Sequence, residues 1–162
     1  MKAATLVGIL VLATSFAAHA QVSEDLYGTW RLVSWTRQVV GTGESADAFG
    51  KAPHGFLHYG RDGRMFAIIV KENRPKPTDL AKMTDQERAE LFKTMLAYGG
   101  TFKVDGGRVV HNVDISWNEN WTGTAQVRNF RIESRRLIIS FDPQIGFDGR
   151  QITAVLTWEK LQ

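Results

Sequence analysis

The chain has 162 residues, no cysteine and a formal net charge of +3 at neutral pH. This length allows a single domain around one core. The absence of cysteine excludes disulfides, thiol catalysis and zinc–thiolate sites. So small a basic excess, with no Lys/Arg run longer than two residues, argues against a nucleic-acid partner.

Residues 1–20 have the composition of a secretory signal peptide. A lysine at position 2 precedes an apolar run over residues 6–18, and Ala18-His19-Ala20 fits the small-residue pattern of a cleavage site. The apolar run is too short to cross a bilayer comfortably. We therefore expect cleavage after Ala20, a mature domain over residues 21–162 that is periplasmic or secreted, and no membrane span after cleavage. An uncleaved membrane anchor is the alternative.

The mature region is dominated by short strand-like stretches joined mainly by tight turns. The Asp62-Gly63 pair predicts a hairpin, because such a turn needs positive φ. An even number of consecutive strands closes most simply into an up-and-down antiparallel barrel without sheet edges. A barrel of eight strands is either filled or holds one small ligand. We predict an all-β, eight-stranded barrel with one inserted α-helix and strands at residues 29–37, 54–59, 64–70, 101–104, 108–117, 121–132, 136–142 and 150–160.

Two longer segments interrupt the strands. Residues 38–53 predict a loop of the kind that often covers a binding site, with Phe49 as the large apolar residue that would fold back. Residues 84–98 predict the helix, because Thr84 and Glu87 form a capping box and Leu91 begins an apolar stripe that runs to position 98. Glycines at positions 99 and 100 would end it. We expect this helix to pack on the sheet as a lid or plug, with a partner-binding helix as the alternative.

Short motifs follow one another in a fixed order along the mature region. They include Gly28-Thr29-Trp30, Phe49-Gly50, Asp62-Gly63-Arg64-Met65, Asn120-Trp121-x-Gly123 and Gln126-x-Arg128-x-Phe130. In content and order they resemble the bacterial and fungal lipocalin-like domains. This resemblance implies a calycin-type barrel with a central cavity, in which Trp30 closes the floor. It implies little about chemistry, because fold alone does not give function.

One predicted strand carries an unusual polar row. Thr124, Gln126, Arg128 and Phe130 recur at period two and so share a face. If Phe130 faces the core, Gln126 and Arg128 face it too. A buried guanidinium must be paired or solvated. Arg128 therefore packs on Trp30 at the floor, pairs with an acidic residue, or meets an anionic ligand.

Two histidine patterns are candidate sites. His111 shares an otherwise apolar face with Ile115 and Trp117, so it is either a hydrogen-bonded core residue or a ligand-binding or proton-transfer group. His54 and His58 flank Phe56 on one strand face, roughly 13 Å apart, which is too far for one metal ion. We expect no metal and no cofactor. On the polar strand, Trp121 and Val127 are predicted to face outward or onto the helix.

The leading hypothesis is an exported binding protein. It would hold a small hydrophobic or amphiphilic ligand, a lipid among the candidates, with a mostly apolar body and a polar or anionic end. No nucleophile motif is present, which favours binding over catalysis. The predicted ligand-binding residues are Gln126, Arg128, Phe130, His111, Trp117, Thr124, Phe56 and Trp30.

Two other functions remain open at this point. The same cavity could serve an isomerase, cyclase or hydratase, with His111 transferring a proton and Arg128 stabilising an enolate-like charge. The third hypothesis is an envelope protein-inhibitor module that acts through its outer surface or through residues 38–53.

Overall fold

The computed structural model describes residues 24–146 and 148–162. The predicted signal peptide and its cleavage site lie outside the described residues. Within these residues, nine strands form one antiparallel sheet. Their bounds are β1 Gly28–Val39, β2 Ser45–Asp47, β3 His54–Tyr59, β4 Arg64–Val70, β5 Met95–Asp105, β6 Arg108–Ser116, β7 Ala125–Glu133, β8 Arg136–Ile145 and β9 Gln151–Lys160.

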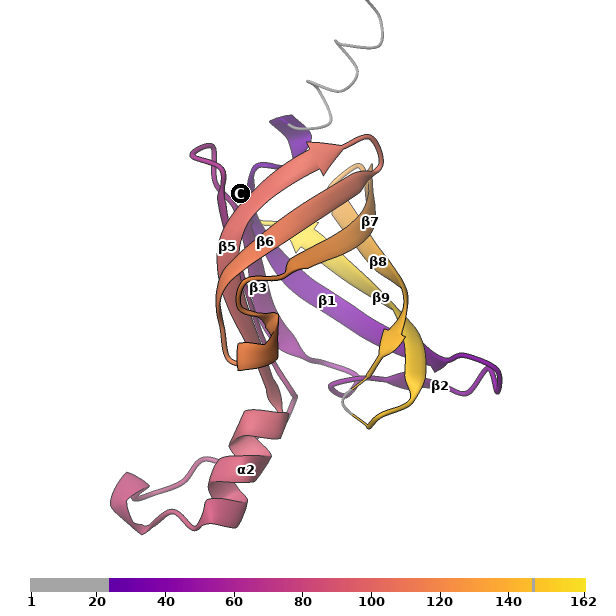
Figure 1. The fold of residues 1–162 in the computed structure, drawn as a ribbon. Coiled ribbons are helices and arrows are strands. Elements are labelled where there is room, and N and C mark those ends of the chain that lie inside the picture. Colours follow the sequence, from indigo (N-terminus) through magenta and orange to yellow (C-terminus); the bar gives the residue numbers. More distant parts are fainter. Residues whose placement is uncertain (1–23, 147) are drawn as a thin grey trace, which may run out of the picture.

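The sheet closes into a barrel. Each strand from β3 to β9 pairs with the next, and β1 pairs with both β3 and β9 (Figure 1). The closing ladder runs from Trp30 opposite Lys160 to Val39 opposite Ile152. The predicted eight-stranded up-and-down barrel is confirmed, with β2 as an additional short strand on the edge of β1. No helix in the described part of the chain is long and apolar enough to cross a bilayer.

The predicted helix is real but shorter than expected. Helix α2 spans Asp85–Lys93 and follows a single 3₁₀ turn, η1, at Leu80–Lys82. Its capping box is confirmed, since Thr84 Oγ1 accepts from the Glu87 amide at 3.2 Å and the Glu87 carboxylate accepts from the Thr84 amide at 2.8 Å. The prediction that the helix continues to residue 98 is wrong, because residues 95–98 pair with β4 as the start of β5.

The helix is not a plug in the barrel. Figure 1 shows α2 extending away from one end of the sheet. None of its residues is buried, and its largest apolar side chain, Phe92, is 55% exposed. Helix α2 therefore does not block the barrel interior.

A bulge between β5 and β6 decides which side chains face inward. The register passes from Gly99 opposite Ile115 to Gly100 opposite Val113, so one extra residue, Asp114, lies on β6. Ile115 is consequently 67% exposed, which corrects its expected place on the face of His111. A Cβ on Gly100 would lie 1.9 Å from the carbonyl oxygen of residue 112, so the close approach of the strands requires glycine here.

The floor of the barrel is built around Trp30, which is fully buried. Its indole Nε1 donates to the Leu26 carbonyl at 2.9 Å. The Lys160 ammonium lies 5.1 Å from the centre of the Trp30 ring and donates to the Asp25 carbonyl at 2.6 Å. The cation over this tryptophan is therefore Lys160, and the alternative that placed Arg128 there is wrong.

Candidate ligand-binding cavity

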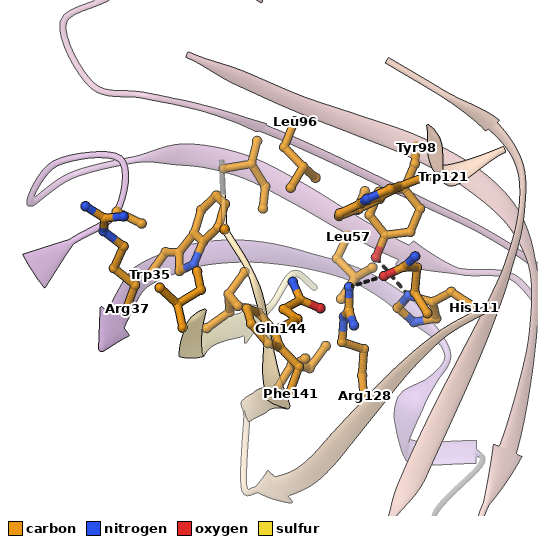
Figure 2. A pocket seen from close by; sticks show the side chains of 18 of the residues that line it. Trp35, Arg37, Leu57, Leu96, Tyr98, His111, Trp121, Arg128, Phe141 and Gln144 are labelled. Atoms are coloured by element: carbon orange, nitrogen blue, oxygen red, sulfur yellow. Dashed lines mark hydrogen bonds between the residues drawn. The ribbon is translucent and has the colours of Figure 1, made fainter. Parts of the chain in front are cut away.

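The barrel encloses a cavity of about 410 Å³. This volume lies within the range of small-molecule pockets, roughly 300–1,000 Å³. Most of its wall is apolar and comes from inward-facing positions of the strands (Figure 2). The apolar lining residues include Trp35, Phe49, Leu57, Ala67, Ile69, Leu96, Trp121, Ile139, Phe141, Ile152, Leu156 and Trp158.

Phe49 folds back over the cavity, as the sequence predicted. It follows β2 in the segment that leads to β3, and it is only 6% exposed. Its ring lies 4.6 Å from that of Trp35, centre to centre, in a tilted arrangement. An aromatic pair from a loop and from β1 therefore forms one part of the wall.

Arg128 brings a buried positive charge to this wall. It lies on β7 and is 7% exposed. Its guanidinium donates to the Val127 carbonyl at 2.9 Å and to the Gln126 side-chain oxygen at 3.0 Å, and it lies 5.0 Å from the centre of the Phe141 ring. Figure 2 shows the side chain extending into the cavity. Among residues 24–146 and 148–162, none of the ion pairs includes Arg128.

His111 is held between two tyrosines. It is 1% exposed; its Nε2 lies 2.7 Å from the Tyr59 hydroxyl and its Nδ1 lies 2.8 Å from the Tyr98 hydroxyl. Burial, and secondarily the charge of Arg128, lower the pKa of His111 from its ordinary value of 6.5 to about 3. The imidazole is therefore neutral at physiological pH.

The two phenols are neutral as well. Burial raises the pKa of Tyr59 well above its ordinary value and also raises that of Tyr98, where the charge of Arg128 opposes the rise. The other cationic lining residue, Arg37, is paired with Asp148 at 2.8 Å. Neutral groups therefore surround the positive charge of Arg128 in the cavity wall.

Two further donors in the wall have no acceptor. The indole Nε1 atoms of Trp35 and Trp158 are buried and lack a hydrogen-bond partner within the described part of the chain. Buried donors of this kind normally find a partner. Two of the residues that line the cavity therefore each hold an N–H donor that no described group satisfies.

Three of the eight predicted ligand-binding residues line the cavity. These are Gln126, Arg128 and His111. The prediction that Gln126, Arg128 and Phe130 share an inward face is confirmed by the burial pattern of β7, and Val127 faces outward as expected. Phe130 packs against the edge of the core and does not line the cavity.

The other four predicted residues lie elsewhere. Phe56 is 47% exposed, because the inward positions of β3 are Leu57 and Tyr59. Thr124 is exposed and precedes β7, where it accepts from the Gln126 amide at 3.0 Å. Trp30 lies in the floor. Trp117 packs beside Trp121 at 5.2 Å and beside Phe92 at 6.4 Å, outside the cavity wall.

Tyr59, Tyr98 and Trp121 were missed as site residues. Trp121 was expected on a strand, facing outward or onto the helix, but it ends a 3₁₀ turn, η2 at Glu119–Trp121. Its ring meets that of Tyr98 edge-on at 5.4 Å. Tyr98 was assigned to the helix. A signal for Tyr59 was available, since alternation places it on the same face as Leu57.

The chain matches the family described as the lipocalin-like domain over residues 27–161. This chain belongs to the lipocalin-like domain family. The family resemblance seen in its motifs is thereby confirmed. The lipocalin-like chain is also similar to the 4'-hydroxy-3'-methoxypropiophenone carrier protein of Aspergillus oryzae, with 35% identity over 107 residues that cover 60% of this chain and 96% of that protein.

Proposed function

We propose that this lipocalin-like protein carries a small, mostly apolar molecule whose polar or anionic end meets Arg128 and Gln126. The observation that carries the proposal is the Arg128 guanidinium, 7% exposed in the wall of the barrel cavity and outside every ion pair of the described residues. A charge buried without a counter-charge is costly unless a further partner arrives. A ligand oxygen would be that partner.

The shape of the cavity and the relative support the same ligand class. The apolar and aromatic wall suits a flat, hydrophobic body. The compound named for the Aspergillus oryzae protein is a phenolic aromatic ring with a short ketone side chain. It combines an apolar body with an oxygen acceptor, and it is therefore the first probe for this chain. Its binding here is part of the proposal.

The geometry gives less support to catalysis. Both ring nitrogens of His111 are engaged by tyrosine hydroxyls, and burial holds its pKa at about 3. A general base works best with a pKa near the operating pH and with access to the substrate proton. His111 meets neither requirement, so we do not favour the isomerase, cyclase or hydratase hypothesis.

Two measurements test the proposal. Native mass spectrometry of protein purified from its own host should reveal a bound small molecule of the stated class. Calorimetric titration with 4'-hydroxy-3'-methoxypropiophenone should then show binding that Ala67→Phe abolishes, because Ala67 lines the cavity and is 3% exposed. The matched control is Ala125→Phe on the exposed face of β7, which should bind normally. Equal binding by the two variants would show that the cavity is not the site.

Export forms the remaining part of the proposal. It is supported by the apolar run and the Ala18-His19-Ala20 pattern within residues 1–20. Amino-terminal sequencing of the protein from its host should give Gln21 as the first residue. An intact first methionine on protein found inside the cell would refute it.

A further inference from the structure

In the hydrogen-bonded chain of Tyr59, His111 and Tyr98, the geometry determines which group donates each proton. A neutral imidazole has one N–H donor and one nitrogen acceptor. His111 uses both nitrogens on phenol hydroxyls, so one tyrosine donates to it and the other accepts from it. In either arrangement one phenol is left with a hydroxyl proton that must find another acceptor.

Tyr59 cannot be the tyrosine with the spare proton. It is fully buried, it does not line the cavity, and among the described residues its hydroxyl has a hydrogen bond with His111 alone. A buried O–H without an acceptor is costly. The Tyr59 hydroxyl therefore donates to Nε2 of His111, which places the imidazole proton on Nδ1.

The direction of the second hydrogen bond follows from this assignment. Nδ1–H of His111 donates to the Tyr98 oxygen at 2.8 Å. The hydroxyl proton of Tyr98 must then point away from Nδ1 of His111. Tyr98 lines the cavity together with Arg128, so the cavity is where its proton can meet an acceptor. Figure 2 shows the Tyr98 hydroxyl directed at His111 on the side of the cavity where Arg128 extends.

We propose that Tyr59 is a positioning residue that acts through His111 to fix Tyr98 as a hydrogen-bond donor beside Arg128, so that the site selects ligands ending in an acceptor-only oxygen. This inference rests on the proposed function. The selected class comprises ketones, aldehydes and carboxylates. The Gln126 side-chain oxygen, which also lines the cavity, accepts from Arg128 at 3.0 Å.

The same arrangement disfavours alcohols. An alcohol oxygen can accept from Tyr98 and Arg128, but its own O–H must then find an acceptor other than these two donors, whereas a ketone has no such proton to place. A site that leaves a ligand's polar hydrogen unpaired binds that ligand more weakly. We expect a ketone to bind at least ~10-fold more tightly than the alcohol formed by reducing it.

Nitrogen NMR tests the direction of the chain without a ligand. In the wild-type protein the side-chain ¹⁵N shifts of His111, assigned by their loss in His111→Gln, should report protonated Nδ1 and bare Nε2. In Tyr59→Phe the donor to Nε2 is gone, and the tautomer populations should move toward Nε2–H. Tyr27→Phe is the matched control, because Tyr27 lies outside the cavity wall and contacts Phe102 and Arg61. A wild-type imidazole protonated on Nε2 would overturn the proposal.

Ligand selection is tested with a matched pair of compounds. The probes are 4'-hydroxy-3'-methoxypropiophenone and the secondary alcohol obtained by reducing its ketone. The wild type and Tyr27→Phe should prefer the ketone at least ~10-fold, and Tyr98→Phe should lower that preference to within about threefold. Tyr59→Phe should also lower it; if that variant does not fold, Tyr98→Phe and the wild-type NMR spectrum still decide the matter.

The outcomes separate the two proposals. Equal binding of ketone and alcohol by the wild type would overturn the selection while leaving the carrier function in place. Binding of neither compound, together with no ligand in native mass spectrometry, would overturn the carrier function and the selection with it. The NMR measurement would then still decide the direction of the hydrogen bonds.

Discussion

Replacing Arg128 with methionine should stabilise the fold and weaken ligand binding at the same time. Methionine keeps the length and the apolar stem of the side chain and removes its charge. Arg128 is 7% exposed, and none of the ion pairs of residues 24–146 and 148–162 involves it. Its desolvation is therefore offset only by neutral groups.

The expected magnitudes follow from the contacts. The variant loses two charge-assisted hydrogen bonds, to Val127 and Gln126, and the contact with the Phe141 ring. In the wild type these three interactions, about 1–3 kcal/mol each, nearly cancel the desolvation cost of several kcal/mol for a buried ion. Because no counter-charge is present, we expect the desolvation cost to be the slightly larger of the two. We expect the free energy of unfolding to rise by about 1 kcal/mol, or ~2–4 °C in melting temperature. Loss of the charged contact to a ligand oxygen should weaken binding by roughly 10- to 100-fold.

The assay pairs thermal denaturation with calorimetric titration of 4'-hydroxy-3'-methoxypropiophenone. Arg131→Met is the matched control, because Arg131 lies on the same strand, faces outward and pairs with Glu133 at 2.7 Å with 63% of its side chain exposed. Arg131→Met should change neither the melting temperature nor the affinity for the ligand. An Arg128→Met protein that melts well below the wild type would show that the guanidinium is structural, and unchanged affinity would show that it does not contact the ligand.

Three more predictions concern pH, packing and access to the cavity. The pKa of His111 in the folded protein is about 3, below its ordinary value of 6.5, so the unfolded chain binds a proton first as pH falls. Stability is therefore lost as pH falls from 6.5 toward 3. Relative to His111→Gln, denaturant titrations should show that the free energy of unfolding falls by up to ~1.4 kcal/mol per pH unit. Gly100→Ala places a Cβ 1.9 Å from a backbone oxygen and should lower the free energy of unfolding by at least ~2 kcal/mol, whereas Gly107→Ala, with no atom within 4 Å of the new Cβ, should have little effect. Phe49→Ala removes the ring that packs on Trp35 and should speed ligand dissociation roughly tenfold in stopped-flow fluorescence.

Each of these has a contrary result. Parallel pH profiles for the wild type and His111→Gln would mean that the imidazole is charged or hydrated in the folded protein. Equal stability of the two glycine variants would place the β5–β6 bulge elsewhere. An unchanged dissociation rate for Phe49→Ala would mean that the ligand leaves by another route.

Much of this fold follows from local sequence. Alternation predicted the strands that form the barrel, the Asp62-Gly63 turn predicted the β3–β4 hairpin, and the capping box predicted where α2 begins. Alternation also placed Gln126 and Arg128 on the inner face of β7. These features depend on neighbours within a few residues, and so the sequence carries them directly.

The end of the helix was not determined in this way. Leu91 and Tyr98 fit a helical stripe, yet Leu96, Tyr98 and Gly100 fit a strand equally well at period two. Pairing with β4 decided between the two. The same glycine that suggested a helix end is instead required by the close approach of β6.

The candidate site was decided by tertiary structure. Tyr59, Tyr98 and His111 come from three strands, β3, β5 and β6. The tertiary structure of the barrel brings the two tyrosine hydroxyls within 2.8 Å of the His111 ring nitrogens. The extra residue at Asp114 then turns Ile115 outward. Cross-strand register and bulges depend on the partner strand, and periodicity within one strand carries no information about them.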